Sequence, residues 1–195
     1  SGLVVIGLAG TNSKYFVYSF VILLISMPFA ISILKPYQKL RILTFLDPDR
    51  DPLGAGYQII QSKIAIGSGG WSGTGLGGSV QKLFYLPEAH TDFVFAIYAE
   101  EFGFVGVIFL LFLYSFFVVR IMHLGKKAIS RQNWYAAYVL IGFGLILSGQ
   151  AFINLGVNAG LLPTKGLTLP FISYGGSSLL VCCAMLGMML RLSHE

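Results

Sequence analysis

Four long apolar stretches alternate with more polar connections along the chain. They cover about residues 15–34, 103–119, 134–155 and 175–190. Each approaches the roughly 20 apolar residues that a helix needs to cross the hydrocarbon core of a membrane. The pattern predicts an all-α polytopic membrane protein with four transmembrane helices in a single membrane domain. The opening stretch 2–10 is too short to span and no Met precedes it, so we expect the chain to be the C-terminal part of a longer protein.

The composition supports this class and excludes others. Hydrophobic residues make up 55% of the 195 residues and charged residues only 11%, whereas a soluble domain carries roughly 25% charged residues. A water-soluble domain of this size could not bury so much apolar surface. The formal net charge of +5 therefore indicates cytoplasmic loops and contact with anionic membrane lipid, and not binding of nucleic acid.

The positive charges indicate an orientation in the membrane. The connection 120–133 carries four Lys or Arg residues, whereas the connection 156–174 carries Lys165 alone. Because positively charged short loops stay in the cytoplasm, 120–133 is predicted to be cytoplasmic and 156–174 extracytoplasmic. Alternation then places the long segment 35–102 outside and the C-terminus inside.

The segment 35–102 is longer than a connection between two helices requires, which is typical of functional loops. Residues 56–66 (GYQIIQSKIAI) alternate apolar and polar side chains with helical spacing, which predicts a short helix at the membrane interface. Pro87 and Glu88 suit the first turn of another helix, on which Glu88 and Asp92 would share one face.

A glycine-rich stretch, 67–78 (GSGGWSGTGLGG), places Gly73, Gly75 and Gly78 in the G-x-G-x-x-G spacing of dinucleotide-binding loops. That motif functions between a strand and a helix of a βαβ unit, and the surrounding pattern predicts neither. We interpret the stretch as a flexible loop whose glycines let the backbone approach another part of the molecule. An interpretation between these two is that its backbone amides approach the phosphate of a lipid headgroup.

Asp92 is the sharpest candidate for chemistry. It stands in HTDFVFAI, where almost every following residue is apolar. A carboxylate at the edge of the hydrocarbon is costly, and such a residue usually faces a cavity or a partner. The position suits a general acid or base. The structural alternatives are that Asp92 caps a helix or pairs with Lys82 or Arg50.

The remaining candidates also carry structural interpretations. Glu100 and Glu101 stand at the entry to the second span, where interfacial anchoring explains them better than catalysis does. Snorkelling to the headgroups and binding of an anionic substrate account for Lys165 equally well. Ser173 suits capping at the start of the last helix. No spacing of His, Cys and acidic residues indicates a metal cage.

Two long stretches resemble the SEDS family (shape, elongation, division and sporulation). They are 80–106 (VQKLFYLPEAHTDFVFAIYAEEFGFVG) and 154–178 (NLGVNAGLLPTKGLTLPFISYGGSS), and DPLGAGYQIIQS at 51–62 adds to them. The resemblance covers nearly the whole chain, and PTKGLTLP is more similar to the division branch than to the elongation branch. It implies that the four spans are the last four of a ten-span fold.

The resemblance implies a peptidoglycan glycosyltransferase that polymerises lipid II into glycan strands during septal cell-wall synthesis. Through its HTDF context, the essential acid of the family maps onto Asp92. The implied partners are lipid II, an undecaprenyl-pyrophosphate-linked glycan, a class B penicillin-binding transpeptidase of the FtsI type and other divisome proteins. The implied location is the bacterial inner membrane at the division septum.

The implied reaction inverts the sugar carbon, which is α-linked to pyrophosphate in the donor and β-linked in the product. One in-line displacement needs one base, and we expect Asp92 to take the proton of the acceptor 4-hydroxyl. The leaving pyrophosphate needs charge stabilisation, for which Lys82, Arg50 and Lys165 are candidates and a divalent cation, Mg²⁺ or Mn²⁺, is a candidate cofactor. The other candidate substrate-binding residues are Glu88, Glu100 and Ser173.

Two other functions stay open at this point. A lipid II flippase or transporter fits multiple spans with Pro- and Gly-interrupted segments and a lone Lys. Transport needs polar residues distributed through the spans, and these spans hold only Gln150, Asn154 and a few Ser. A non-catalytic divisome scaffold is the third interpretation, in which Asp92 would be dispensable for polymer synthesis.

Overall fold

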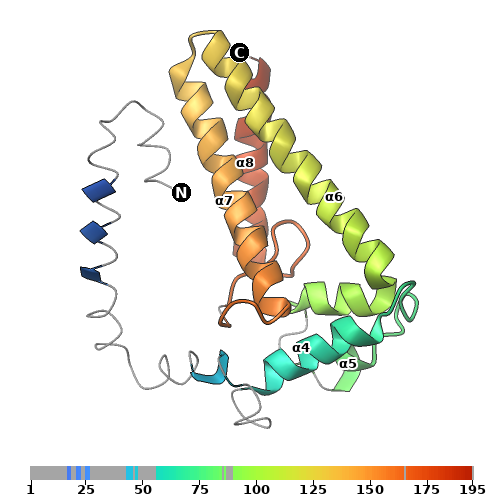
Figure 1. Cartoon of the computed structure of the whole chain (residues 1–195). Coiled ribbons are helices and arrows are strands. Elements are labelled where there is room, and N and C mark those ends of the chain that lie inside the picture. The colour runs from blue at the N-terminus through green and yellow to red at the C-terminus, as the bar shows by residue number, and fades with distance from the viewer. Residues whose placement is uncertain are drawn as a thin grey trace.

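The computed structural model describes residues 17–18, 21–22, 25–26, 43–45, 47, 56–84, 86, 90–164 and 166–194. The main elements of this part of the chain are all helices: α4 (Tyr57–Ser68), α5 (Val80–Phe84), α6 (Val94–Ser130), α7 (Trp134–Asn158) and α8 (Gly176–His194). In Figure 1, α7, α8 and the long limb of α6 run side by side, while α4 and the first part of α6 lie across one end of this bundle. The predicted all-α class is confirmed, including the short helix expected near residues 56–66.

Three helices are long and apolar enough to cross a membrane: Val94–Ser130, Trp134–Asn158 and Gly176–Ser193. They correspond to the second, third and fourth predicted spans. The first predicted span, 15–34, falls mostly outside the described residues. These helices identify an integral membrane protein.

Helix α6 extends well beyond the predicted 103–119. Residues 120–130, assigned to a loop from their charges, continue the helix, and only 131–133 connect it to α7. The reason is that Ile121, Gly125 and Ala128 recur at helical spacing and are buried, while Lys and Arg side chains stay on the exposed face. Positive charges set the orientation of a connection without ending the helix that carries them.

The contact between α6 and α7 is close because small residues line it. A side chain at Gly125 would collide with Ile141, and one at Gly144 would press on Ile121 and Met122. Leu140 and Leu147 of α7 continue this core, and α8 adds Cys182, Met185 and Met189. Small residues at such contacts let transmembrane helices approach closely and gain packing energy in lipid.

Helix α6 changes direction at Gly103, where φ is 64° and ψ is −163°. This left-handed conformation favours glycine because a side chain would clash there. The part before the kink, 94–102, lies across the end of the bundle with α4, and the part after it, 104–130, runs along α7 (Figure 1).

The glycine-rich stretch packs its backbone directly against this kink. The amides of Thr74 and Gly75 donate to the carbonyl oxygens of Glu100 (3.0 Å) and Glu101 (3.1 Å). A Cβ atom at Gly73 would lie 2.0 Å from the Glu101 oxygen, so only glycine fits. The expected close approach of its backbone is confirmed, and it is made to the protein itself: these amides bind carbonyls and not a lipid phosphate. No strand precedes the stretch in the described residues, so it also lacks the context of a dinucleotide site.

Candidate functional site

Asp92 lies in a turn, 90–92, directly before α6, and it is half-buried. A helix was expected to open at Pro87 and to place Glu88 and Asp92 on one face; Pro87 and Glu88 lie outside the described residues, 90–92 form a turn, and α6 begins at Val94. That expectation is wrong for Asp92, which precedes the helix. The N-cap residue of α6 is Phe93, whose side chain makes no capping hydrogen bond.

The main chain of Asp92 is held by two side-chain amides of α7. Its carbonyl oxygen accepts hydrogen bonds from Asn154 Nδ2 at 2.9 Å and from Asn158 Nδ2 at 3.0 Å. Both asparagines are buried, with 2% and 0% of their surface exposed. Asn154 Nδ2 also donates to the carbonyl oxygen of Leu167 at 2.5 Å. Asn154 therefore joins the turn of Asp92 to the loop that follows α7, and Asn158 adds a second hydrogen bond to the same Asp92 carbonyl.

The carboxylate of Asp92 lies against that loop. A Cβ atom built on Gly166 would stand 3.2 Å from Asp92 Oδ2, so the carboxylate and this glycine are direct neighbours. The amide of Tyr174 donates to the carbonyl oxygen of His90 at 2.9 Å and fixes the turn to the loop a second time. The two stretches that carry the family resemblance therefore meet at Asp92.

A groove of about 420 Å³ lies beside this loop, between α7 and α8. Its polar lining comes from Gln150, Thr168, Ser177 and Ser178, and its apolar lining from α7 and α8. Gln150 Nε2 donates to the carbonyl oxygen of Thr168 at 2.9 Å, and the hydroxyls of Thr168 and Ser178 are 2.8 Å apart. Gly166 lines this groove and also neighbours the Asp92 carboxylate, so the groove and the acid share this glycine.

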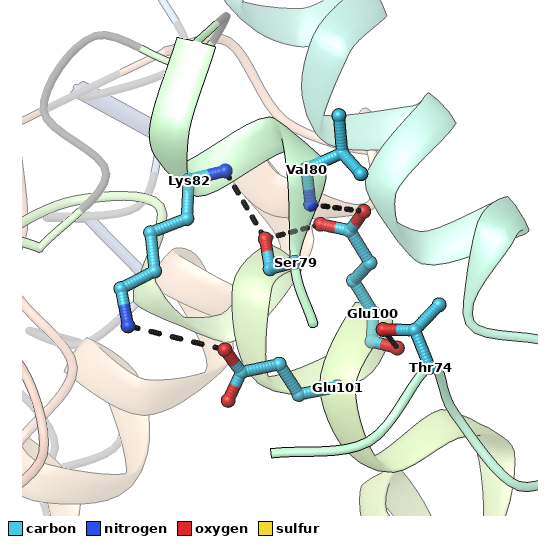
Figure 2. Close-up of polar contacts among 6 residues, drawn as sticks. All are labelled: Thr74, Ser79, Val80, Lys82, Glu100 and Glu101. Atoms are coloured by element: carbon cyan, nitrogen blue, oxygen red, sulfur yellow. Dashed lines mark hydrogen bonds and ion pairs between the residues drawn. The ribbon is translucent and has the colours of Figure 1, made fainter. Parts of the chain in front are cut away.

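Glu100 and Lys82 belong to a different cluster, shown in Figure 2. Glu100 is buried, and its carboxylate accepts hydrogen bonds from Ser79 Oγ (2.5 Å) and from the amide of Val80 (3.2 Å). Lys82 Nζ lies 3.9 Å from Glu101 Oε1. Among the described residues, the carboxylate that Lys82 reaches is thus that of Glu101, not Asp92. The cluster attaches α5 to α6.

The remaining predicted residues divide into two groups. Ser173 is buried, and its Oγ accepts a hydrogen bond from the amide of Leu169 at 2.8 Å, which closes a turn before α8. Arg50, Glu88 and Lys165 lie outside the described residues. Within the described part of the chain, no three His, Cys, Asp or Glu side chains are grouped so that they could hold a metal ion.

Asn158 is not among the site residues predicted from the sequence, and Asn154 is considered there only as evidence against transport. A signal was present, because Gln150, Asn154 and Asn158 are spaced four residues apart in an otherwise apolar helix. This spacing places them on one face of α7. Amides in a membrane-spanning helix are costly unless they are hydrogen-bonded, so such a stripe indicates a polar contact with a neighbouring segment.

Comparisons with known proteins agree with the architecture. Residues 1–195 match the family of cell cycle proteins FtsW/RodA/SpoVE. The "Probable peptidoglycan glycosyltransferase FtsW" of Pseudomonas fluorescens is 56% identical over 161 residues, which are 83% of this chain and 40% of that protein. The protein of the same name from Thioalkalivibrio sulfidiphilus is 50% identical over 197 residues, covering 100% of this chain and 48% of that protein. The chain thus spans about half the length of these curated relatives.

Solved structures are similar as well. One, described as "Structural coordination of polymerization and crosslinking by a peptidoglycan synthase complex", has a TM-score of 0.70 and 40% identity, covering 97% of this chain and 52% of that chain. A crystal structure of a mutant of the rod shape determining protein RodA from Thermus thermophilus has a TM-score of 0.51 and 31% identity, covering 80% and 53%. The resemblance inferred from the sequence is confirmed: the chain belongs to the FtsW/RodA/SpoVE family of cell cycle proteins, the SEDS family, and is FtsW-like.

Proposed function

We propose that the protein containing this chain is a peptidoglycan glycosyltransferase that polymerises lipid II into glycan strands during septal cell-wall synthesis, and that Asp92 is its catalytic base. The observation that carries the proposal is the placement of the Asp92 carboxylate at the junction of the turn 90–92, the loop at Gly166 and the groove beside it. The names of the relatives from Pseudomonas fluorescens and Thioalkalivibrio sulfidiphilus support the same activity.

The proposed reaction is an inverting displacement. Asp92 takes the proton of the acceptor 4-hydroxyl as this oxygen attacks the sugar carbon, and the bond from that carbon to pyrophosphate breaks. The glycosidic bond forms on the face opposite the leaving group, so the α-link of the donor becomes a β-link. Gly166 assists because it has no side chain that would narrow the approach to Oδ2.

The departing pyrophosphate requires positive charge. Lys165 is the first candidate because it directly precedes Gly166, the neighbour of the Asp92 carboxylate. Lys82 is a weaker candidate because it lies beside Glu101. Arg50, which lies outside the described residues, stays a candidate on the basis of the sequence. A divalent cation, Mg²⁺ or Mn²⁺, is the alternative source of charge, and removing it with EDTA distinguishes the two.

The proposed partners and location follow from the relatives. The matched solved structure is described as a synthase complex that coordinates polymerization and crosslinking. This supports a class B penicillin-binding transpeptidase of the FtsI type as a partner, with other divisome proteins. We place the protein in the bacterial inner membrane at the septum, with 35–102 and 156–174 outside and the C-terminus in the cytoplasm.

Transport is less well supported. The amides of the polar stripe on α7 are hydrogen-bonded to carbonyl groups of the protein, so they do not offer a row of open groups along a pathway. Binding groups in a transporter must line a cavity near the middle of the membrane.

The test is a polymerisation assay with the complete protein, its transpeptidase partner and purified lipid II, with Mg²⁺, Mn²⁺ or EDTA. Asp92→Asn keeps the size of the side chain and removes the base, so polymer formation is expected to fall by at least about 10²-fold. Folded Asp92→Asn protein that makes polymer at the normal rate contradicts the catalytic assignment. Lipid II transport by Asp92→Asn vesicles without polymer formation would favour the flippase.

A further inference from the structure

A hydrogen bond that would extend α6 is replaced by a side chain. In an α-helix the amide of residue i donates to the carbonyl oxygen of residue i−4. One more residue of α6 would therefore join the amide of Ala96 to the carbonyl of Asp92. Instead, the Ala96 amide is shared between the Phe93 carbonyl oxygen at 3.0 Å and Asn158 Oδ1 at 3.2 Å, and Asn158 Nδ2 donates to the Asp92 carbonyl at 3.0 Å. The Asn158 amide stands between the two groups that the helix would have paired.

This bridge is itself fixed on several sides. The Asn158 carbonyl oxygen accepts a hydrogen bond from Ser62 Oγ of α4 at 2.8 Å. Asn158 Nδ2 also lies 2.9 Å from the carbonyl oxygen of Asn154, one turn earlier in α7. Asn154 in turn contacts the Asp92 carbonyl and the Leu167 carbonyl. The turn of Asp92, the loop at Gly166 and α4 thus share one buried set of hydrogen bonds.

We propose that Asn158, with Asn154, is a positioning residue for Asp92. The amides of Asn158 and Asn154 both donate to the Asp92 carbonyl oxygen, hold the turn 90–92 against α7, and so keep the Asp92 carboxylate beside Gly166. This inference rests on the proposed function of Asp92. Without the two asparagine donors, the Asp92 carbonyl loses both of its side-chain partners, the turn 90–92 is no longer held to α7, and the carboxylate loses its fixed place beside Gly166.

The first experiment measures steady-state polymerisation by the complete protein with its partner and lipid II. Asn158→Ala removes both halves of the bridge, and kcat is expected to fall on the order of 10²-fold because a small displacement of a catalytic group has this effect. KM should stay unchanged, since both asparagines are buried and line no part of the groove, so only the chemical step should suffer. Asn154→Ala removes one of the two donors to the Asp92 carbonyl, so its kcat should fall by less, about 10-fold.

Ser62→Ala is the matched control. It also removes a buried hydrogen bond to Asn158, but that bond goes to the main chain and leaves the side-chain bridge intact. Its thermal stability should fall, by less than in Asn158→Ala because one hydrogen bond is lost and not several, while kcat stays at the wild-type value. An unchanged kcat in folded Asn158→Ala, or an equal loss of kcat in Ser62→Ala, overturns the proposal. Should Asn158→Ala not fold, an unchanged kcat in Asn154→Ala overturns it.

A second readout does not depend on activity. Asp92→Cys is prepared in a cysteine-free background with and without Asn158→Ala, and its reaction rate with a water-soluble thiol reagent is measured. A several-fold change in rate caused by Asn158→Ala supports the positioning role, and equal rates contradict it. Normal polymer formation by Asp92→Asn, combined with such a change, would remove the catalytic role of Asp92 while leaving the positioning by Asn158 in place.

Discussion

The short limb of α6, residues 94–102, is held differently at its two ends. At its start, the turn of Asp92 is held by side-chain amides of α7 that donate to a carbonyl oxygen. At its end, the kink at Gly103 is held by main-chain contacts, where Phe104 N–H donates to the Gly70 carbonyl at 2.9 Å. At the turn, hydrogen bonds hold the main chain and leave the Asp92 carboxylate half-buried. At the kink, main-chain atoms are packed so closely that no side chain fits at Gly103.

The two kinds of contact have different roles: the close glycine contacts determine the fold, and the amide hydrogen bonds determine where Asp92 lies. Glycine contacts tolerate no added atom, so they fix where α6 bends and how the loop 69–78 lies on it. Amide contacts can be removed without a collision, so changes there should alter the placement of Asp92 more than the fold. The two ends therefore predict opposite outcomes for mutation: loss of folding at the kink and loss of activity at the turn.

The largest effect is expected at the kink. Gly103→Ala forces a side chain into a left-handed conformation, and its Cβ would lie 2.3 Å from the Gly73 nitrogen. We expect destabilisation of about 3 kcal/mol or more, measured as a lower thermal unfolding midpoint in detergent. Gly67→Ala is the control, because nothing lies within 4 Å of its Cβ and α4 is helical there. Equal stability of the two variants would show that the kink does not depend on this close contact.

Glu100→Ala tests the polar part of the same end. It removes the acceptor for Ser79 Oγ and for the Val80 amide, which hold the start of α5. Each buried hydrogen bond to a charged group contributes about 2 kcal/mol, and two are lost, so stability should fall by at least this amount. Amide hydrogen exchange of 79–84 should rise while kcat per folded molecule is retained. A strong loss of kcat with unchanged exchange would return Glu100 to the substrate-binding residues.

Gly166→Ala tests the other end through its neighbour. The added Cβ would lie 3.2 Å from Asp92 Oδ2, a tight contact in a backbone conformation that alanine can adopt. Crowding of the base should lower kcat about 10-fold, with stability within about 0.5 kcal/mol of wild type. Gly176→Ala, where nothing lies within 4 Å, should keep kcat. A wild-type kcat in Gly166→Ala would place the reacting sugar on another side of the carboxylate.

The sequence predicts some of these features and not others, for physical reasons. Hydrophobic stretches report burial in lipid, so α6, α7 and α8 were predictable, and Asp92 was noticeable as an acid before an apolar run. The start of α6 at Val94 was not predictable from the local pattern. The Ala96 amide and the Asp92 carbonyl beside this start both bond to Asn158, more than sixty residues away. In the same way, Glu100 could be found as an acid but not recognised as the anchor of Ser79.

The smallest effect is expected for a third asparagine of α7, and it sharpens the comparison most directly. Asn133 lies at the opposite end of the helix, where its side chain accepts the Ala136 amide at 3.1 Å and caps α7. Asn133→Ala should lower stability by about 1 kcal/mol, the usual effect of losing an N-cap, and should leave kcat and KM unchanged. Thermal unfolding and the lipid II assay measure both quantities in one preparation. If Asn133→Ala lowers kcat as much as Asn158→Ala does, both asparagines affect activity only by stabilising the protein. The contacts at the turn of Asp92 would then have the same role as those at the kink.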